Sequence, residues 1–103
     1  MKGGMQQLMK QANQLQLKIK KMQEELATRE YEASAGGEAV KVRVISDQKM
    51  SAIVISEDLM KSGDVEMLQD LIMTATNEAL RKAKETQATE MEKVTGGFNF
   101  PGM

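Results

Sequence analysis

Adjacent acidic residues are the first groups in this sequence that could take part in catalysis. They occur at Glu24-Glu25 and Glu57-Asp58, and Glu90 and Glu92 lie two residues apart. Neighbouring residues on a helix point about 100° apart, so these pairs do not converge on one substrate. Solvated helix surface is therefore the favoured interpretation of these acids, and we do not expect an enzyme.

Two glycine doublets and the composition exclude further kinds of chemistry. Gly36-Gly37 and Gly96-Gly97 lack the third glycine, or the following Lys-Ser/Thr, of a phosphate-binding loop, so we interpret them as turn and tail residues. The chain has no His and no Cys, which removes imidazole bases, thiol nucleophiles, disulfides and zinc fingers. We therefore predict no metal site, no cofactor and no small-molecule substrate.

Basic residues in two helical stretches are better candidates, because they could bind phosphate groups. They are Lys2, Lys10, Lys18, Lys20 and Lys21 in the first stretch and Arg81, Lys82 and Lys84 in the second. The formal net charge of the 103 residues is −1, which by itself does not favour nucleic acid over an ordinary charged surface. The first 27 residues, however, hold five lysines and two glutamates, a local charge of +3. No aromatic residue lies among these lysines, so contacts with duplex DNA should be made mainly with phosphates.

A heptad pattern predicts a long N-terminal helix over about residues 5–27. An amphipathic basic helix could also lie on a membrane, but this one has no aromatic residue and a Gln-rich polar face, so we expect no membrane binding. The apolar side of this helix forms a seam that would pack on a partner helix or on the chain's own domain, and we assign it as a dimer or core seam. Its apolar residues recur in steps of three and four, at Met5, Leu8, Ala12, Leu15, Ile19, Met22 and Leu26.

A periodicity of two residues predicts three strands within about residues 29–55. Val40, Val42 and Val44 alternate with other residues, a weaker alternation precedes them at 30–34, and residues 50–55 are mostly apolar. The glycines at 36–37 and the polar residues at 46–49 supply the turns. We expect an antiparallel meander with helices covering one face.

A second long helix is predicted over about residues 65–94. A short helical turn capped by Ser56 precedes it, and Asp64 is suited to be its N-cap. A helix of this length spans about 45 Å, more than the diameter of about 33 Å of a compact 100-residue domain, so its second half should project or pack on another subunit. We expect one α+β domain over residues 1–95 and a flexible tail over 96–103.

Several short stretches, in their order and spacing, resemble the YbaB/EbfC family of bacterial nucleoid-associated proteins. The resemblance extends over nearly the whole chain and implies a homodimer whose projecting helices form a tweezer-like shape. The implied fold is a helix, a three-stranded antiparallel sheet and a long C-terminal helix. The stretches are Gly3-Gly4-Met5, Leu8-Met9-Lys10-Gln11-Ala12, Lys20-Lys21-Met22-Gln23-Glu24-Glu25-Leu26, Val40-Lys41-Val42, Ile55-Ser56-Glu57-Asp58-Leu59, Glu66-Met67-Leu68-Gln69-Asp70-Leu71, Asn77-Glu78-Ala79 and Val94-Thr95-Gly96-Gly97.

The resemblance further implies binding of duplex DNA, with little or moderate sequence preference, and roles in nucleoid organisation and gene regulation. The sequence has no signal peptide and no apolar run long enough to span a membrane, so we expect a nucleoid-associated protein of the bacterial cytoplasm. The alternative is an oligomeric helical adaptor that binds other proteins, with DNA contact incidental. DNA contact in the family is attributed to the two long helices, which here contain Lys10, Lys20, Lys21, Arg81, Lys82 and Lys84.

Overall fold

The computed structural model describes residues 2–95, with side chains from residue 4 onward. It confirms the predicted α+β fold class, a long N-terminal helix, a three-stranded antiparallel sheet, a short helix and a long C-terminal helix. The expected tail, residues 96–103, lies outside the described residues. The elements follow in the order α1 (Lys2–Thr28), β1 (Glu30–Ala35), β2 (Val40–Ile45), β3 (Lys49–Ile55), α2 (Glu57–Ser62) and α3 (Val65–Thr95).

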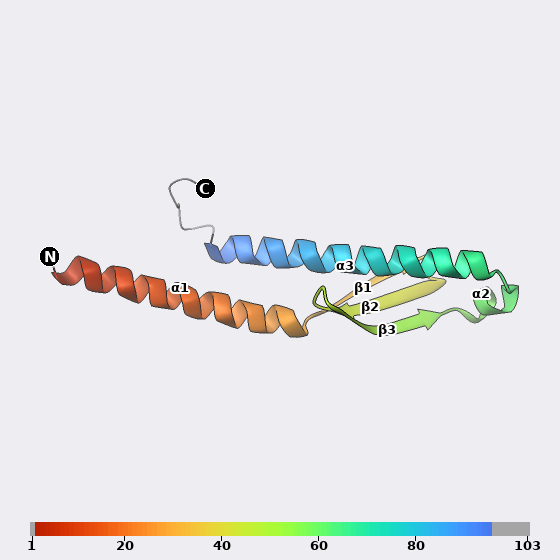
Figure 1. Cartoon of the computed structure of the whole chain (residues 1–103), viewed down its shortest axis with the longest axis horizontal. Coiled ribbons are helices and arrows are strands. Elements are labelled where there is room, and N and C mark those ends of the chain that lie inside the picture. Colours follow the sequence, from red (N-terminus) through yellow and green to blue (C-terminus); the bar gives the residue numbers. More distant parts are fainter. Residues whose placement is uncertain (1, 96–103) are drawn as a thin grey trace.

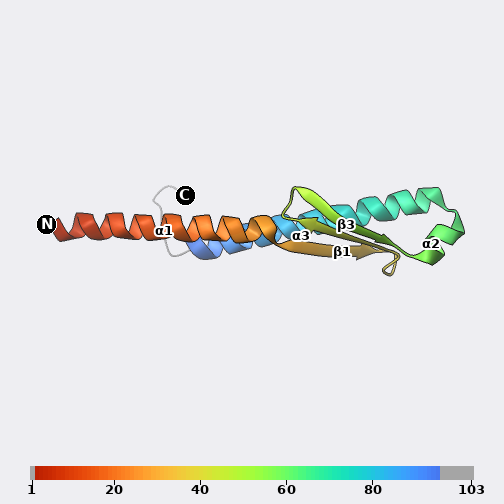
Figure 2. The ribbon, with the colours of Figure 1, turned by 90° about the horizontal axis from the view of Figure 1, so that it is seen from below.

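The chain forms an elongated rod. Its principal extents are 74 × 25 × 16 Å and its radius of gyration is 20.5 Å, against about 13 Å for a compact domain of this length. As its length requires, α3 extends past the sheet. Helix α1 runs antiparallel beside the C-terminal half of α3 and continues beyond the end of that helix (Figures 1 and 2). The N-terminal part of α1 is therefore an arm that has no neighbouring element among residues 2–95.

The sheet has the order β1-β2-β3, and one of its faces packs on α3. Both pairs of strands are antiparallel, as the predicted meander requires. The centre of the core is β2, whose residues Val40, Val42 and Val44 have no exposed surface. They lie in one apolar cluster with Ala75, Ala79 and Ala83 of α3, whose small side chains let the helix approach the sheet closely.

Capping residues mark the ends of the helices that follow β3. The Ser56 hydroxyl accepts a hydrogen bond from the Leu59 N–H at 3.1 Å and begins α2, and Gly63 ends it with a φ of 69°. The Asp64 carboxylate accepts a hydrogen bond from the Met67 N–H at 3.0 Å and begins α3. Both predicted N-caps are confirmed.

The turn between β1 and β2 requires glycine for two reasons. Gly36 has a φ of +66°, which other residues adopt only with strain. A β-carbon at this position would also lie 2.8 Å from Leu71 Cδ1, so the turn packs directly against α3. The neighbouring Gly37 also has a positive φ of 62°, but the space beside it is open.

Candidate nucleic-acid interface

The lysines of α1 are exposed along the helix. Lys10, Lys20 and Lys21 all have exposed side chains, and within residues 4–95 none of them lies within 4.0 Å of a carboxylate oxygen. Lys10 and Lys21 are about three turns and about 17 Å apart on the side opposite the apolar seam, because a helix rises 1.5 Å per residue. Lys20 lies beside Lys21 on the same polar surface. Helix α1 thus presents basic side chains that form no ion pair with an acid of the described chain.

The predicted cationic residue Arg81 on α3 is, in contrast, held by two carboxylates. Its guanidinium donates hydrogen bonds to Glu78, with Nε 3.0 Å from Oε2, and to Glu85, with Nη1 2.6 Å from Oε1. The hydrogen bond from Arg81 lowers the pKa of the Glu78 carboxyl, and the bonds to Glu78 and Glu85 raise the pKa of Arg81 above its usual value. All three side chains are solvent-accessible, so this cluster adds little stability. Its net charge is −1.

The two other basic residues predicted on α3 differ from each other. Lys82 donates from Nζ to the backbone carbonyl of Glu32 at 3.0 Å and so links α3 to the edge strand β1. Lys84 is exposed and has no carboxylate oxygen within 4.0 Å in the described part of the chain. Of the basic residues predicted on α3, Lys84 is the one whose side chain makes no hydrogen bond or ion pair within the described residues.

The basic residues of the two helices do not form one patch. Lys21 lines a shallow hollow with Val94, near the C-terminal end of α3. Arg81 precedes Val94 by 13 residues, or about 20 Å along the helix axis. The lysines of α1 and the cluster on α3 therefore occupy separate positions along the rod.

Sequence reasoning missed the role of Glu78. The spacing Glu78-x-x-Arg81-x-x-x-Glu85 places both acids one helical turn from the arginine, at i−3 and i+4, where side chains of opposite charge meet. That spacing indicates the pairing of Arg81, although Lys20 and Glu24, also four residues apart, form no ion pair within 4.0 Å.

The apolar seam of α1 is covered only at one end. Leu26 is buried, with 5% of its surface exposed, and joins α1 to the body. At the other end Met5 and Leu8 are 69% and 65% exposed. The seam thus contributes to the chain's own core near the sheet and is open along the arm. The remaining predicted seam residues, Leu15, Ile19 and Met22, are half-buried.

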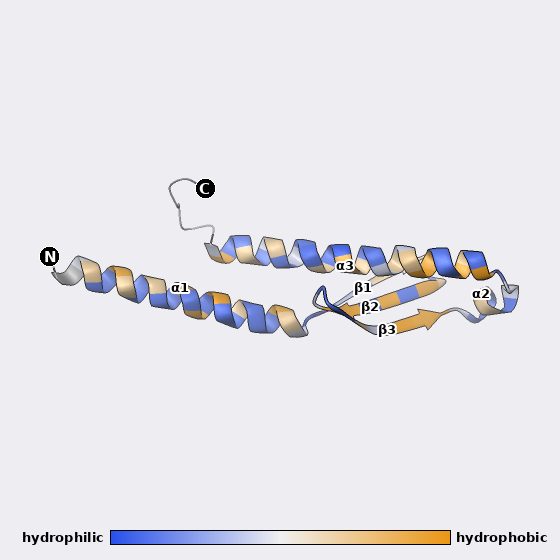
Figure 3. Ribbon diagram, in the orientation of Figure 1, coloured by the Kyte–Doolittle hydropathy of each residue, from blue (hydrophilic) through white to orange (hydrophobic). Residues whose placement is uncertain are grey.

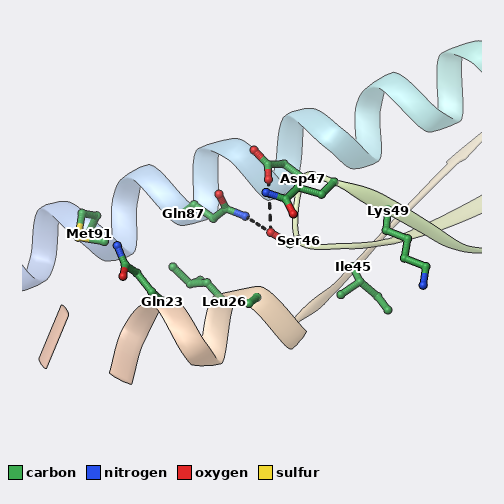
Figure 4. Close-up of a pocket in the computed structure, with 10 residues that line it drawn as sticks. Gln23, Leu26, Ile45, Ser46, Asp47, Lys49, Gln87 and Met91 are labelled. Atoms are coloured by element: carbon green, nitrogen blue, oxygen red, sulfur yellow. Dashed lines mark hydrogen bonds between the residues drawn. The ribbon is translucent and has the colours of Figure 1, made fainter. Parts of the chain in front are cut away.

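A pocket of about 430 Å³ lies where α1 joins the body (Figure 4). Leu26 and Met91 form part of its apolar wall, and the turn between β2 and β3 forms another side. Gln87 Nε2 donates to the Ser46 hydroxyl at 2.8 Å, and this hydroxyl donates to Asp47 Oδ1 at 3.3 Å. These hydrogen bonds join α3 to the turn between β2 and β3, and Leu26 of α1 lines the same pocket, so the pocket lies at a joint between elements. Within the described residues, no three acidic side chains gather as a metal site would require.

Neither long helix in the described range, 2–95, has an apolar stretch of the length and hydropathy that crossing a membrane requires. Charged and amide side chains interrupt the apolar positions of α1 and α3 throughout (Figure 3). The exposed surfaces of both helices are thus mixed, with apolar strips beside charged ones.

Comparison with known proteins gives consistent matches in sequence and in fold. The model of the YbaB/EbfC DNA-binding family matches residues 1–98. A nucleoid-associated protein of Clostridium novyi is 50% identical over 105 residues, covering 100% of this chain and 92% of the relative. One of Desulforamulus reducens is 48% identical over 103 residues, covering 100% and 98%. The crystal structure of an uncharacterized protein from Helicobacter pylori has the same fold, with a TM-score of 0.71 and 19% identity, covering 87% of this chain and 95% of that one.

Proposed function

Because the chain belongs to the YbaB/EbfC DNA-binding family, we propose that it binds duplex DNA as a homodimer, mainly through phosphate contacts, and acts in nucleoid organisation and gene expression. The observation that carries the mechanism is the set of lysines on α1, Lys10, Lys20 and Lys21, which have no carboxylate partner in the described residues. Neutralising phosphates with such side chains releases counterions, which drives association. The chain is a binding protein of the bacterial nucleoid in this proposal, with no enzymatic activity.

The two long helices contribute unequally to DNA binding in this proposal. The lysines of α1 can reach a phosphate without breaking an existing ion pair. Arg81 must first leave Glu78 and Glu85, and Lys82 must leave the backbone of β1. We therefore assign the main contacts to α1 and accessory contacts to α3, with Lys84 as the most accessible of its basic residues.

A slightly negative protein can bind DNA in this way because the charge is unevenly distributed. The first 27 residues carry a formal charge of +3 although the whole chain carries −1. Potentials near a surface depend on local charge, since interactions beyond about 10 Å are screened at ordinary ionic strength. A dimer would present this basic segment twice, and its sequence preference would arise mostly from the shape of DNA.

The test is a titration of random-sequence duplex DNA by fluorescence anisotropy at several salt concentrations. We expect Lys10→Ala and Lys21→Ala each to lower the slope of log Kobs against log salt by about one per copy of the chain, hence by about two for a dimer, because each copy loses a lysine that neutralises one phosphate. The matched control is Lys61→Ala, which removes an exposed lysine from α2 at the other end of the rod and should leave the slope unchanged. Equal slopes for all these proteins would contradict the assignment of the contacts to α1.

The alternative function, an oligomeric adaptor, is favoured by the open part of the seam. Met5 and Leu8 lie on the arm with most of their surface exposed, so a partner helix could cover them. This function predicts that the wild-type protein leaves random duplex DNA unbound at physiological salt and captures a specific protein instead. The same titration therefore separates the two functions.

A further inference from the structure

Helix α3 covers the apolar seam of α1 only up to the point where α3 ends. Val94 and Met22 line one hollow, so the last turns of α3 lie beside this part of α1. Met22 and Ile19 of the seam are half-buried here. Beyond the end of α3 the helix α1 continues (Figure 1), and Leu8 and Met5 are 65% and 69% exposed. We name the exposed stretch the open seam, and it consists of Met5, Leu8 and Ala12.

No charged side chain borders the open seam. Between residues 4 and 16 the only charged residue is Lys10, and the helical period places it on the opposite side of α1. Gln11 and Gln16 lie on the two flanks of the seam. Their amides both donate and accept hydrogen bonds, so they can pair with the N–H and C=O groups of an extended backbone. The open seam is therefore suited to an uncharged, apolar segment in an extended conformation.

The chain itself contains such a segment directly after α3. Residues 96–103, Gly-Gly-Phe-Asn-Phe-Pro-Gly-Met, carry no charged side chain and follow the last residue of α3. They include both phenylalanines of the chain, Phe98 and Phe100. Alternate residues of an extended segment point to the same side, so the two rings would share one face and Asn99 would lie on the other. The segment thus has an apolar face of its own.

The length of this segment matches the length of the open seam. Phe98 and Phe100 are three and five residues past the end of α3, so in an extended chain they reach about 10 and 17 Å beyond it. A helix rises 1.5 Å per residue, so the same distances counted along α1 from Ile19 lead to about residues 12 and 8. Phe98 would therefore lie over Ala12, whose small side chain leaves room for a ring, and Phe100 over Leu8.

We propose that residues 96–103 fold back onto α1 of the same chain and cover the open seam, with Phe98 against Ala12 and Phe100 against Leu8. The bound segment continues the packing that α3 begins. It holds the N-terminal half of α1 helical, because an isolated helix of this length is marginal in water. Lys10, on the opposite side, stays exposed. The inference concerns contacts within one chain, so it stands or falls independently of DNA binding.

The chain's own segment is the occupant that the observations favour. It leaves α3 along the same line on which α3 covers the seam, so no reversal of direction is needed. A short tether also gives the segment an effective concentration in the millimolar range, whereas a second copy or another protein must bind from solution. The segment and the seam are both uncharged, so neither loses an ion pair or buries a charge on binding.

The first test locates the segment with a nitroxide spin label. The chain has no cysteine, so Asn99→Cys gives a single attachment site between the two rings. We expect NMR signals of residues 5–15 to broaden and those of the sheet to stay sharp. Leu8→Asp should abolish the broadening, because it places a carboxylate under Phe100. The matched control is Leu17→Asp, which should keep it, since Leu17 is 66% exposed against 65% for Leu8 but lies on the other side of α1.

A mixed sample separates the chain's own segment from that of a second copy. Spin-labelled protein without an NMR isotope is mixed with isotope-labelled protein that has no spin label. Absence of broadening in this mixture supports binding within one chain, and broadening of residues 5–15 in it would overturn the inference. Sharp signals for residues 5–15 in the directly labelled protein would also overturn it. If Leu8→Asp then lowers the mass measured by light scattering, a second copy covers the seam instead.

The second test measures what the bound segment does to α1. Phe98→Ser combined with Phe100→Ser should raise the hydrogen-exchange rates of residues 5–15 about ten-fold or more, because burial of one phenylalanine ring is worth at least that factor. The matched control is Asn99→Ser, in the same segment, which should exchange at the wild-type rate. None of these positions belongs to the core of the described residues, so the variants are expected to fold. Equal exchange rates in all three proteins would refute the inference.

Discussion

Leu26 fixes the base of α1 on the body, and we expect Leu26→Ala to release this helix while the sheet stays folded. The side chain is 5% exposed and forms part of the wall of the pocket at the joint. Truncation of a buried leucine to alanine costs about 2–5 kcal/mol. Because Leu26 borders an open pocket where neighbours can relax, we expect the lower part of this range, about 2–3 kcal/mol. This corresponds to about a 30- to 150-fold change in an equilibrium constant.

The effect should be local because little else holds α1. Its other seam residues near the body, Ile19 and Met22, are half-buried, and within the described residues the arm beyond them has no neighbouring element. An isolated helix of this length is marginal in water, so α1 would fray once detached. The core between α3 and the sheet contains none of these residues.

Hydrogen exchange measured by mass spectrometry or NMR reports this release. Backbone amides of α1 should exchange about 30- to 150-fold faster in Leu26→Ala, and those of β2 at the wild-type rate. The control is Leu17→Ala on the same helix, where the leucine is 66% exposed and truncation should change exchange by about two-fold or less. Equal acceleration in α1 and β2 would show that arm and body unfold as one unit. Unchanged exchange in α1 would show that Leu26 does not hold it.

Three further changes test individual contacts. Gly36→Ala should lower the free energy of unfolding by about 2 kcal/mol or more, and Gly37→Ala by about 1 kcal/mol. Both glycines have a positive φ, but only a β-carbon at position 36 would crowd α3. Equal urea midpoints for the two variants would contradict this. The NMR-monitored pKa of Glu78 should lie below its ordinary value of 4.5 and return to it in Arg81→Gln, so the ion pair is present at neutral pH and disappears as the pH falls through that lowered pKa. Glu78→Gln combined with Glu85→Gln should strengthen DNA binding and steepen the slope of log Kobs against log salt by about one for each Arg81 that is released. An unchanged slope in anisotropy titrations would exclude a contact from Arg81.

The helices, strands and caps could be predicted because their signals are local. The period of the apolar residues distinguishes a helix from a strand, and Ser56 and Asp64 mark helix starts through bonds to residues three positions away. The charge of Arg81 is equally visible in the sequence, but its availability depends on its neighbours. Its two acids are one helical turn away, so this part of the site was also within reach of the sequence.

The exposure of individual apolar residues could not be predicted in this way. Ile53 and Val42 have the same place in their alternating patterns, yet one is open and the other buried, because a single helix covers only part of the sheet. Leu8 and Leu26 likewise share one heptad seam and differ in burial because α3 ends before it reaches the arm. Alternation determines which side a residue faces, and tertiary structure determines what covers that side.

The elongated shape also determines how the chain migrates through a porous column. A radius of gyration of 20.5 Å is that of a compact protein of about 350 residues. Elution follows hydrodynamic size, and an extended molecule has a larger hydrodynamic radius than a globule of equal mass, so a single rod of this chain is expected ahead of globular standards of its 11.4 kDa mass. Calibration against globular proteins would thus report an assembly where one molecule is present, and the stoichiometry has to be measured as mass.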